Sequence, residues 1–260
     1  MISFKELAKK EYLLNDNEIF SFNYKDEKYW LKKARETAPN KIQKFFYKFL
    51  PFELLIPPLV KNKKEALEFE TSKIERFRKF EINVPKIPYK NEDFFVLKDS
   101  GVSVNSLLRD ENISKEKFYY YVDKLLIELS KIHNINEFHG GSQTRNFTYK
   151  DEKVFVIDFE ESFSSNVDIK SLQYRDFLLF ILSFIKIKEP KFEVDYEYIL
   201  NRYEELTSSK EIIQRLKKFS KKLRFLIWFS ELSFIKNKLG TDVLNFFNFF
   251  KILNSIGNKS

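Results

Sequence analysis

Hydrophobic and polar positions in the first hundred residues follow the pattern of a small unit that contains both strands and helices. Apolar, β-prone runs at 19–24 and 29–33 are separated by a polar turn, which is typical of a β-hairpin. Apolar residues then recur at helical spacing over about 63–80. This helix must end before Pro85, because a residue that precedes proline is pushed out of the helical region. Residues 94–97 are predicted to form one more short buried strand.

The remainder of the chain is mostly helical in pattern. Ser114 is a predicted N-cap, and apolar residues keep a 3.6-residue period from there to His133. Two short β runs, at 146–149 and 154–158, flank a polar turn. The predicted helices of the C-terminal part span about 170–186, 194–206, 209–221, 223–238 and 241–254. The pattern therefore predicts a small α/β lobe, a connection near 98–101 and a larger helical lobe.

Composition limits the chemistry that the chain can perform. Cysteine is absent, so disulfides, thiolate catalysis and cysteine-ligated metals are excluded. The only two histidines, His133 and His139, cannot build a zinc site by themselves. The absence of cysteine also fits a reducing, cytoplasmic location. A net charge of +8 suits an anionic partner such as a nucleotide, a phosphorylated lipid or a nucleic acid, although Lys, Asn, Ile and Phe are all abundant and the charge can equally reflect composition.

No apolar stretch is predicted to span a membrane. Prolines interrupt residues 45–60, and 223–235 is shorter than the roughly 20 residues that a bilayer requires. The N-terminus lacks the apolar core of a secretory signal. A basic, aromatic segment at 36–62 has an apolar face opposite several lysines. Peripheral contact with the inner membrane face through 41–60 is therefore one hypothesis, and packing of this face on the domain is the other.

Three carboxylates lie in apolar surroundings. Glu70 is on the apolar stripe of its predicted helix, where it needs a cation such as Lys32 or Lys33 unless it stays at a wet edge. Asp158 follows the apolar run 154–157, a position that favours contact with a metal or phosphate but is also common in loop capping. Asp176 lies within a strongly apolar predicted helix, so we expect it to be hydrogen-bonded to a buried group.

The loop from His139 to Asn146 has a more specific pattern. Two glycines follow the histidine and permit a tight turn, Asn146 comes seven residues after it, and Asp158 comes twelve residues later. Magnesium prefers hard oxygen ligands and usually takes few of them from protein. Asn146 and Asp158 are therefore the predicted metal ligands.

These motifs resemble the protein-kinase-like superfamily, and within it the bacterial lipopolysaccharide kinases and small atypical kinases. The resemblance covers nearly the whole chain. It implies a two-lobed α+β fold, with an N-lobe at 1–98 that carries the insert at 36–62, and a helical C-lobe at 99–260. ATP and Mg²⁺ are the implied cofactors.

The resemblance also implies a role for each matching residue. Lys32 is similar to the strand lysine that holds the phosphates, with Lys33 as a second candidate, and Glu70 is similar to its helix partner. The segment that contains Leu97 resembles the hinge that holds adenine. Asp158, in Ile-Asp-Phe-Glu, resembles the magnesium-binding aspartate. The resemblance further implies that Asp176 braces the catalytic loop.

Two features depart from the kinase pattern. Gly141 stands where the catalytic-loop aspartate is expected, and no glycine occurs in residues 1–100 to form a phosphate cover. General-base catalysis typically contributes about 10²–10⁴-fold, so a slow enzyme can survive this loss. The candidate catalytic residues are His139, Gln143 and Glu160, with Glu161 as an alternative for orienting the acceptor.

Two main hypotheses follow. The first is an ATP- and Mg²⁺-dependent phosphotransferase that acts on a hydroxyl of a sugar or a lipopolysaccharide-type glycolipid. The alternative is a pseudokinase that binds nucleotide, or only a partner protein, without phosphoryl transfer. A role on nucleic acid ranks last, because basic residues are spread along the chain rather than clustered. The sequence leaves the oligomeric state open.

Overall fold

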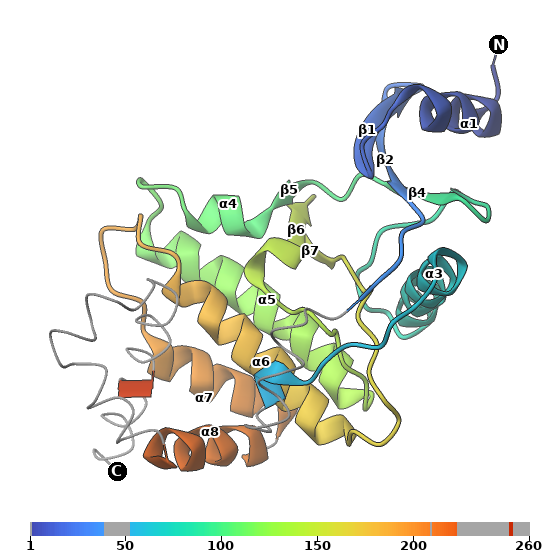
Figure 1. Cartoon of the computed structure of the whole chain (residues 1–260). Coiled ribbons are helices and arrows are strands. Elements are labelled where there is room, and N and C mark those ends of the chain that lie inside the picture. Colours follow the sequence, from blue (N-terminus) through green and yellow to red (C-terminus); the bar gives the residue numbers. More distant parts are fainter. Residues whose placement is uncertain (1, 39–52, 209, 223–249, 252–260) are drawn as a thin grey trace, which may run out of the picture. The chain divides into compact units, whose positions relative to one another are not determined.

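The computed structural model describes residues 2–38, 53–208, 210–222 and 250–251 (Figure 1). Contacts within the chain divide it into two compact units. The first contains residues 1–103, 139–141 and 146–168, and the second contains 104–138, 142–145 and 169–260. The predicted division into 1–98 and 99–260 stays a prediction.

The first unit begins with a helix and an antiparallel sheet. Helix α1 (Phe4–Leu14) starts at a capping box, in which Ser3 and Glu6 satisfy each other's backbone N–H groups. The sheet contains β1 (Ile19–Tyr24), β2 (Glu27–Lys33), β3 (Tyr89–Lys90) and β4 (Phe94–Lys98), in the order β1-β2-β4-β3. The β1–β2 hairpin is paired as the sequence predicts, whereas α1 was not predicted.

Helix α1 lies beside the β1–β2 hairpin (Figure 1), and its apolar side chains pack against one face of the sheet. The apolar cluster between them consists of Ala8, Phe20, Phe22, Tyr29, Leu31, Phe94 and Val96. Because side chains alternate along a strand, Trp30 and Lys32 lie on the opposite face from Tyr29 and Leu31. The face of β2 that α1 covers therefore carries Lys33, and the opposite face carries Lys32.

Helix α3 (Lys63–Lys79) follows the short 3₁₀ helix η1 (Glu53–Leu55). Asn62 and Glu65 form its capping box, and Phe80 caps its C-terminus, close to the predicted end. Its buried stripe includes Glu70 and Phe77.

A second, three-stranded sheet completes this unit. It contains β5 (Val102–Ser103), β6 (Phe147–Lys150) and β7 (Lys153–Val156), in the order β5-β6-β7. The 3₁₀ helix η2 (Thr144–Asn146) leads into β6, and Asp151 and Glu152 make the tight β6–β7 turn with positive φ angles. Strands β6 and β7 correspond to the two β runs predicted from the sequence.

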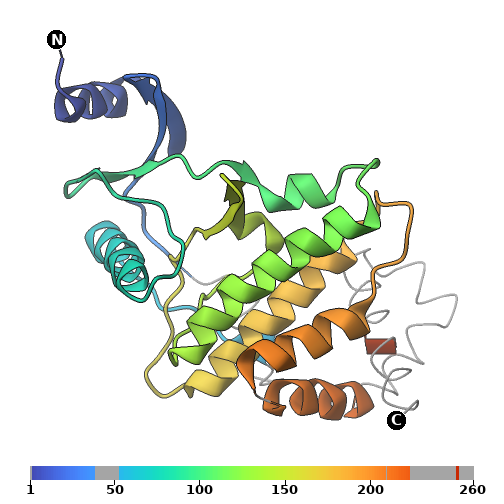
Figure 2. The ribbon, with the colours of Figure 1, turned by 180° about the vertical axis from the view of Figure 1, so that it is seen from behind.

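The second unit is helical (Figures 1 and 2). Helices α5 and α7 pack against each other, with a hydrogen bond of 2.8 Å from Tyr198 to Asp123. The rings of Phe177 on α6 and Tyr203 on α7 are stacked at 3.9 Å. The helices are α4 (Val104–Leu108), α5 (Lys115–Asn134), α6 (Ile169–Ile185), α7 (Tyr196–Thr207) and α8 (Glu211–Lys222).

The predicted helices at 114–133, 170–186, 194–206 and 209–221 correspond to α5, α6, α7 and α8 within a few residues. The helix predicted at 223–238 falls outside the described residues, and so do residues 39–52 of the basic, aromatic segment. So does the helix predicted at 241–254, apart from Phe250 and Lys251. Within the part of the chain that the structure describes, no helix combines the length and apolarity needed to cross a membrane.

Candidate functional site

Lys32 is the centre of a buried charge cluster in the first unit. Its Nζ atom lies 2.8 Å from Glu70 Oε1, 2.9 Å from Asp158 Oδ1 and 3.5 Å from Glu160 Oε2. Lys32 and Glu70 are only 7% and 3% exposed, so the pair is shielded from water. Strand β2 and helix α3 thus each supply one charged group to the same point, and the segment after β7 supplies two.

The carboxylates keep this lysine charged in spite of its burial. Burial by itself lowers the pKa of the Lys32 ammonium, but attraction to Glu70, Asp158 and Glu160 outweighs burial and raises the pKa above its usual value. An ammonium that stays protonated in a low-dielectric site is well suited to bind an anionic oxygen.

Asp158 is the accessible carboxylate of the cluster. It follows β7 with a φ angle of 68°, a left-handed conformation that is uncommon for a residue other than glycine and that often marks functional sites. Its side chain is 35% exposed, against 4% for that of Glu70. Burial raises the pKa of Asp158, but the charge and hydrogen bond of Lys32 outweigh burial, and the net effect lowers it. Asp158 is therefore ionised and partly accessible to solvent, while Glu70 is buried beside Lys32.

Asn146 has an amide orientation that is set by its neighbour. Its Nδ2 atom donates to the carbonyl oxygen of Gly141 at 2.6 Å, and a carbonyl can only accept, so the amide oxygen is left for another partner. The backbone carbonyl of Asn146 accepts from the N–H of Ile157 at 3.0 Å, which ties Asn146 to the residue before Asp158. These two side chains supply one amide oxygen and one carboxylate.

This donor set fits magnesium. Mg²⁺ is usually held by one or two carboxylates together with waters and substrate phosphates, rather than by a complete protein cage. Among the described residues, no group of three or more His, Asp or Glu side chains could hold a metal ion. Asn146 and Asp158 would leave most coordination positions of Mg²⁺ to waters and phosphates.

Glu160 connects the cluster to two further cations. Nη2 of Arg35 lies 2.7 Å from both of its carboxylate oxygens, and Nζ of Lys61 donates to its backbone carbonyl at 2.6 Å. Hydrogen bonds to Glu160 raise the pKa of the Arg35 guanidinium. Burial lowers the pKa of Lys61, although Glu160 and Glu161 oppose this effect.

His139 is part of a cluster of aromatic rings with Phe159 and Phe77. It is fully buried, and its ring lies 4.9 Å from that of Phe159, which in turn makes an edge contact with Phe77 of α3 at 5.1 Å. The buried Lys73 of α3 donates to the carbonyl oxygen of His139 at 3.1 Å. This position favours a role for His139 in supporting the loop rather than in contact with an acceptor.

The other predicted ligands lie elsewhere. Lys33 is on the α1 side of β2, where its Nζ donates to the carbonyl oxygen of Asn15 and lies 4.8 Å from the ring of Tyr12. Leu97 is half-buried on β4, opposite Trp30 of β2. Gln143 is half-buried and groups with the second unit. Of the two candidate lysines, Lys32 is thus the one that the structure places beside Glu70.

Asp176 is fully buried in the second unit, as expected from its apolar surroundings. Its carboxylate lies 3.5 Å from Nε2 of His133 on α5, and its backbone carbonyl accepts from the hydroxyl of Ser142. Gln173, one turn earlier, donates to the carbonyl oxygen of His133 at 2.9 Å. Helix α6 thus holds the end of α5 and residue 142 of the loop, an arrangement that favours the predicted brace.

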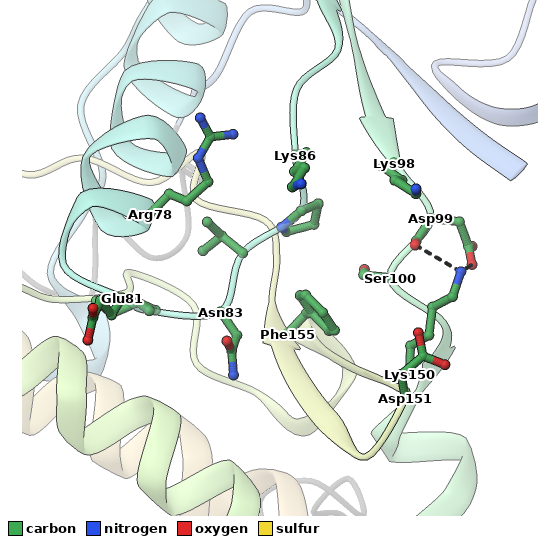
Figure 3. A pocket seen from close by; sticks show the side chains of 13 residues that line it. Arg78, Glu81, Asn83, Lys86, Lys98, Asp99, Ser100, Lys150, Asp151 and Phe155 are labelled. Carbon is green, nitrogen blue, oxygen red and sulfur yellow. Dashed lines mark hydrogen bonds and ion pairs between the residues drawn. The ribbon is translucent and has the colours of Figure 1, made fainter. Parts of the chain in front are cut away.

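The predicted hinge segment borders a cavity of about 420 Å³ (Figure 3). Its walls include residues 81–86, Asp99, Lys150 and Phe155. Lys150 is 3.2 Å from Asp99 Oδ2, and the indole nitrogen of Trp30 donates to the other oxygen of Asp99 at 2.9 Å. Asp99 therefore anchors the segment after β4 to both β2 and β6.

Arg35, Lys61 and Lys73 were missed by the sequence reasoning. Each is one of many basic residues in the N-terminal part, and none falls at a motif position. The buried position of Lys73 on the helical stripe, next to Glu70 and Ile74, was the only available signal.

The chain is similar in sequence to curated proteins and in fold to a solved structure. No family model matches the chain. It is 28% identical over 176 residues to an uncharacterized protein of Haemophilus influenzae, covering 68% of this chain and 65% of that protein. It is 32% identical over 139 residues to EKC/KEOPS complex subunit BUD32 of Enterocytozoon bieneusi, covering 50% of this chain and 66% of that protein. The chain thus spans about two thirds of the length of these curated relatives.

A solved structure of WaaP in complex with acyl carrier protein has the same fold. The TM-score is 0.52, the identity is 11%, and the match covers 82% of this chain and 83% of that one. The predicted α+β, two-lobed protein-kinase-like fold is therefore confirmed.

Proposed function

We propose that this chain, a protein-kinase-like and lipopolysaccharide-kinase-like protein, transfers a phosphoryl group from ATP to a hydroxyl group with the help of Mg²⁺. The observation that carries the proposal is Lys32, a buried and charged lysine held between Glu70 and the accessible Asp158 at 2.8 and 2.9 Å. A lysine with only a structural role in the core would not need two carboxylate partners, one buried and one accessible to solvent.

In this proposal each residue of the cluster has one task. Lys32 binds phosphate oxygens, and Glu70 fixes its direction. Asp158 and the amide oxygen of Asn146 hold the metal, and bound Mg²⁺ neutralises charge on the phosphates. The segment that contains Leu97 offers backbone groups to the adenine ring. These roles are supported by the geometry and by the fold, and they are open to direct measurement.

The chemistry depends mainly on positioning. Phosphoryl transfer passes through a loose transition state in most analyses, so charge neutralisation matters more than proton abstraction. Gly141 provides no base, and the carboxylate of Glu160 is hydrogen-bonded to Arg35 at 2.7 Å and lies 3.5 Å from Lys32. We therefore propose that Glu160 or Gln143 orients the acceptor and that turnover is slow.

The acceptor that we propose is a hydroxyl of a sugar or of a lipopolysaccharide-type glycolipid. This rests on the fold that the chain shares with WaaP and on the hypothesis that residues 41–60 contact the inner membrane face. Most of the segment expected to make that contact, 41–60, lies outside the described residues. Co-sedimentation with anionic lipid vesicles tests this part separately.

Gly141 favours a second function, in which the chain binds nucleotide without transferring phosphate. One pair of measurements separates the two functions. Thermal stabilisation by ATP, with and without Mg²⁺, reports binding, and consumption of ATP in the presence of candidate glycolipids reports transfer.

The test uses Asp158→Ala, with Asp93→Ala as the matched control because Asp93 is an exposed aspartate of the same unit. We expect Asp158→Ala to abolish both turnover and the Mg²⁺-dependent part of the stabilisation, and Asp93→Ala to change neither. Undiminished turnover in Asp158→Ala would refute the proposed enzyme. Stabilisation by Mg-ATP without turnover on any acceptor would favour the second function.

A further inference from the structure

Arg35 lies beside the Lys32 cluster and has no task in the proposed function. Its Nη2 atom is 2.7 Å from both carboxylate oxygens of Glu160, and its Nη1 atom is 2.9 Å from Glu18. A guanidinium has five N–H donors, and the contacts among the described residues use only Nη1 and Nη2. The side chain is 40% exposed. Arg35 is therefore held in place while keeping donors for an anionic ligand.

A cavity of about 260 Å³ opens at Arg35. Its walls are Arg35, Glu36, Thr37, Ala38, Pro58, Glu160 and Glu161. The hydroxyl oxygen of Thr37 is buried and has no hydrogen-bond partner among the described residues. The backbone of Thr37 is fixed by two hydrogen bonds to Lys61, of 3.0 and 3.1 Å.

An unsatisfied buried hydroxyl costs free energy, and such a group in a cavity points to a missing partner. The cavity combines this hydroxyl with the guanidinium of Arg35. Both can donate hydrogen bonds, and arginine in particular matches the oxygens of a phosphate group. Anionic oxygen is thus the chemistry that these two groups would recognise.

The carboxylates decide when such a ligand can bind. Glu160 is shared between Arg35 at 2.7 Å and Lys32 at 3.5 Å, and Asp158 lies 2.9 Å from Lys32. Both cations are thus already paired with carboxylates. A polyphosphate without a metal ion must break the ion pairs of Arg35 and Lys32, and it is then repelled by the carboxylates of Glu160 and Asp158. A divalent cation that binds these carboxylates removes the repulsion and leaves Arg35 and Lys32 free to bind phosphate.

We propose that Arg35, together with the hydroxyl of Thr37, binds the terminal phosphate of the nucleotide, and that Glu160 holds Arg35 until nucleotide and metal bind together. The inference rests on the proposed function and deepens it. It also gives a reason why the chain can lack glycine in its first hundred residues, because side-chain donors replace a glycine-rich phosphate cover.

Three substitutions separate the parts of this inference. Arg35→Gln should weaken Mg-ATP binding about tenfold to a hundredfold, the usual cost of a hydrogen bond to a charged group, and should leave adenosine binding within about twofold. Thr37→Val should weaken Mg-ATP binding about twofold to tenfold. Glu160→Gln should act in the opposite direction on metal-free ATP, because Arg35 is then no longer neutralised.

The experiment is isothermal titration calorimetry of the full chain with adenosine, ADP and ATP, each with and without Mg²⁺. Arg76→Gln is the matched control, since Arg76 is an exposed arginine of the same unit on α3 and lines neither this cavity nor the one near the hinge. Circular dichroism and the thermal midpoint without ligand establish that each variant is folded. Because Glu160→Gln must gain affinity for metal-free ATP, a loss of folding cannot imitate its expected result.

The inference is supported if Arg35→Gln weakens the binding of ATP more than that of ADP and leaves adenosine binding unchanged. It also requires that Glu160→Gln reduces the difference between the ATP affinities measured with and without Mg²⁺. Unchanged ATP affinity in Arg35→Gln, or an equal loss for ADP and ATP, overturns the phosphate assignment. Unchanged metal-free affinity in Glu160→Gln overturns its holding role. If the wild-type chain binds no nucleotide at all, the proposed function fails together with this inference, whereas wild-type binding with an unaffected Arg35→Gln defeats the inference alone.

Discussion

Removal of the Lys32 ammonium is the most direct test of the charge cluster. Lys32→Met keeps the length of the side chain but leaves Glu70, which is 3% exposed, without its cation and close to Asp158 and Glu160. Breaking a buried ion pair by removing one partner typically costs about 3–5 kcal/mol. Because the Asp158 side chain is one-third exposed and partly screened, we expect the lower end, about 3 kcal/mol at pH 7.

The double variant Lys32→Met/Glu70→Gln makes the prediction specific. It also removes the unpaired negative charge of Glu70, so it should be more stable than Lys32→Met alone, by about 1–2 kcal/mol. The pH dependence of the stability of Lys32→Met has a definite direction. Without its cation, Glu70 has a folded-state pKa above its unfolded value. Its buried charge therefore destabilises the folded state at high pH, and protonation removes this cost as pH falls. Lys32→Met should therefore lose less stability at pH 5 than at pH 7.

The assay is urea unfolding of the full chain at both pH values, with hydrogen exchange of α3 to locate the effect if the two units unfold separately. Lys79→Met, an exposed lysine at the end of the same helix, is the control and should change stability by less than about 0.5 kcal/mol. A cost below about 1 kcal/mol for Lys32→Met, or a double variant less stable than Lys32→Met, would refute the reasoning.

Three further predictions concern the same unit. Gly101→Ala should destabilise by more than about 2 kcal/mol, because Gly101 has a φ of +95° and an added Cβ would lie 2.1 Å from the carbonyl oxygen of Tyr149; an unchanged thermal midpoint would contradict this. Phe159→Ala removes a fully buried ring and should cost about 3–5 kcal/mol in urea unfolding, whereas Phe159→Leu should cost much less. The pKa of Asp158 is lowered by Lys32, so its contribution to stability is present above the unfolded value of about 4 and is lost as pH falls through the lower folded value. Thermal midpoints of Asp158→Asn should accordingly fall less steeply between about pH 5 and pH 2 than those of wild type, and parallel curves would argue against the contact with Lys32.

The positions of Glu70 and Asp158 could be predicted from the sequence, because they depend on local periodicity. Glu70 could be assigned to the buried stripe of α3 because helical spacing is visible in seventeen consecutive residues. Asp158 could be placed after a buried strand because the preceding run is apolar. The resemblance in order, from Lys32 to Asp176, then predicted the protein-kinase-like fold that the comparison with WaaP confirms.

Which cations lie beside Glu70, Asp158 and Glu160 depends on the tertiary structure. Lys32 and Lys33 are adjacent and equivalent as sequence, but α1 covers the face of β2 that carries Lys33, and this leaves Lys32 for Glu70. Arg35 and Glu160 are 125 residues apart and belong to no shared motif. Their ion pair depends on how β2 and the segment after β7 come together, and no local pattern encodes that distance. The identity of the buried charges was legible in the chain, whereas their pairing is a property of the folded unit.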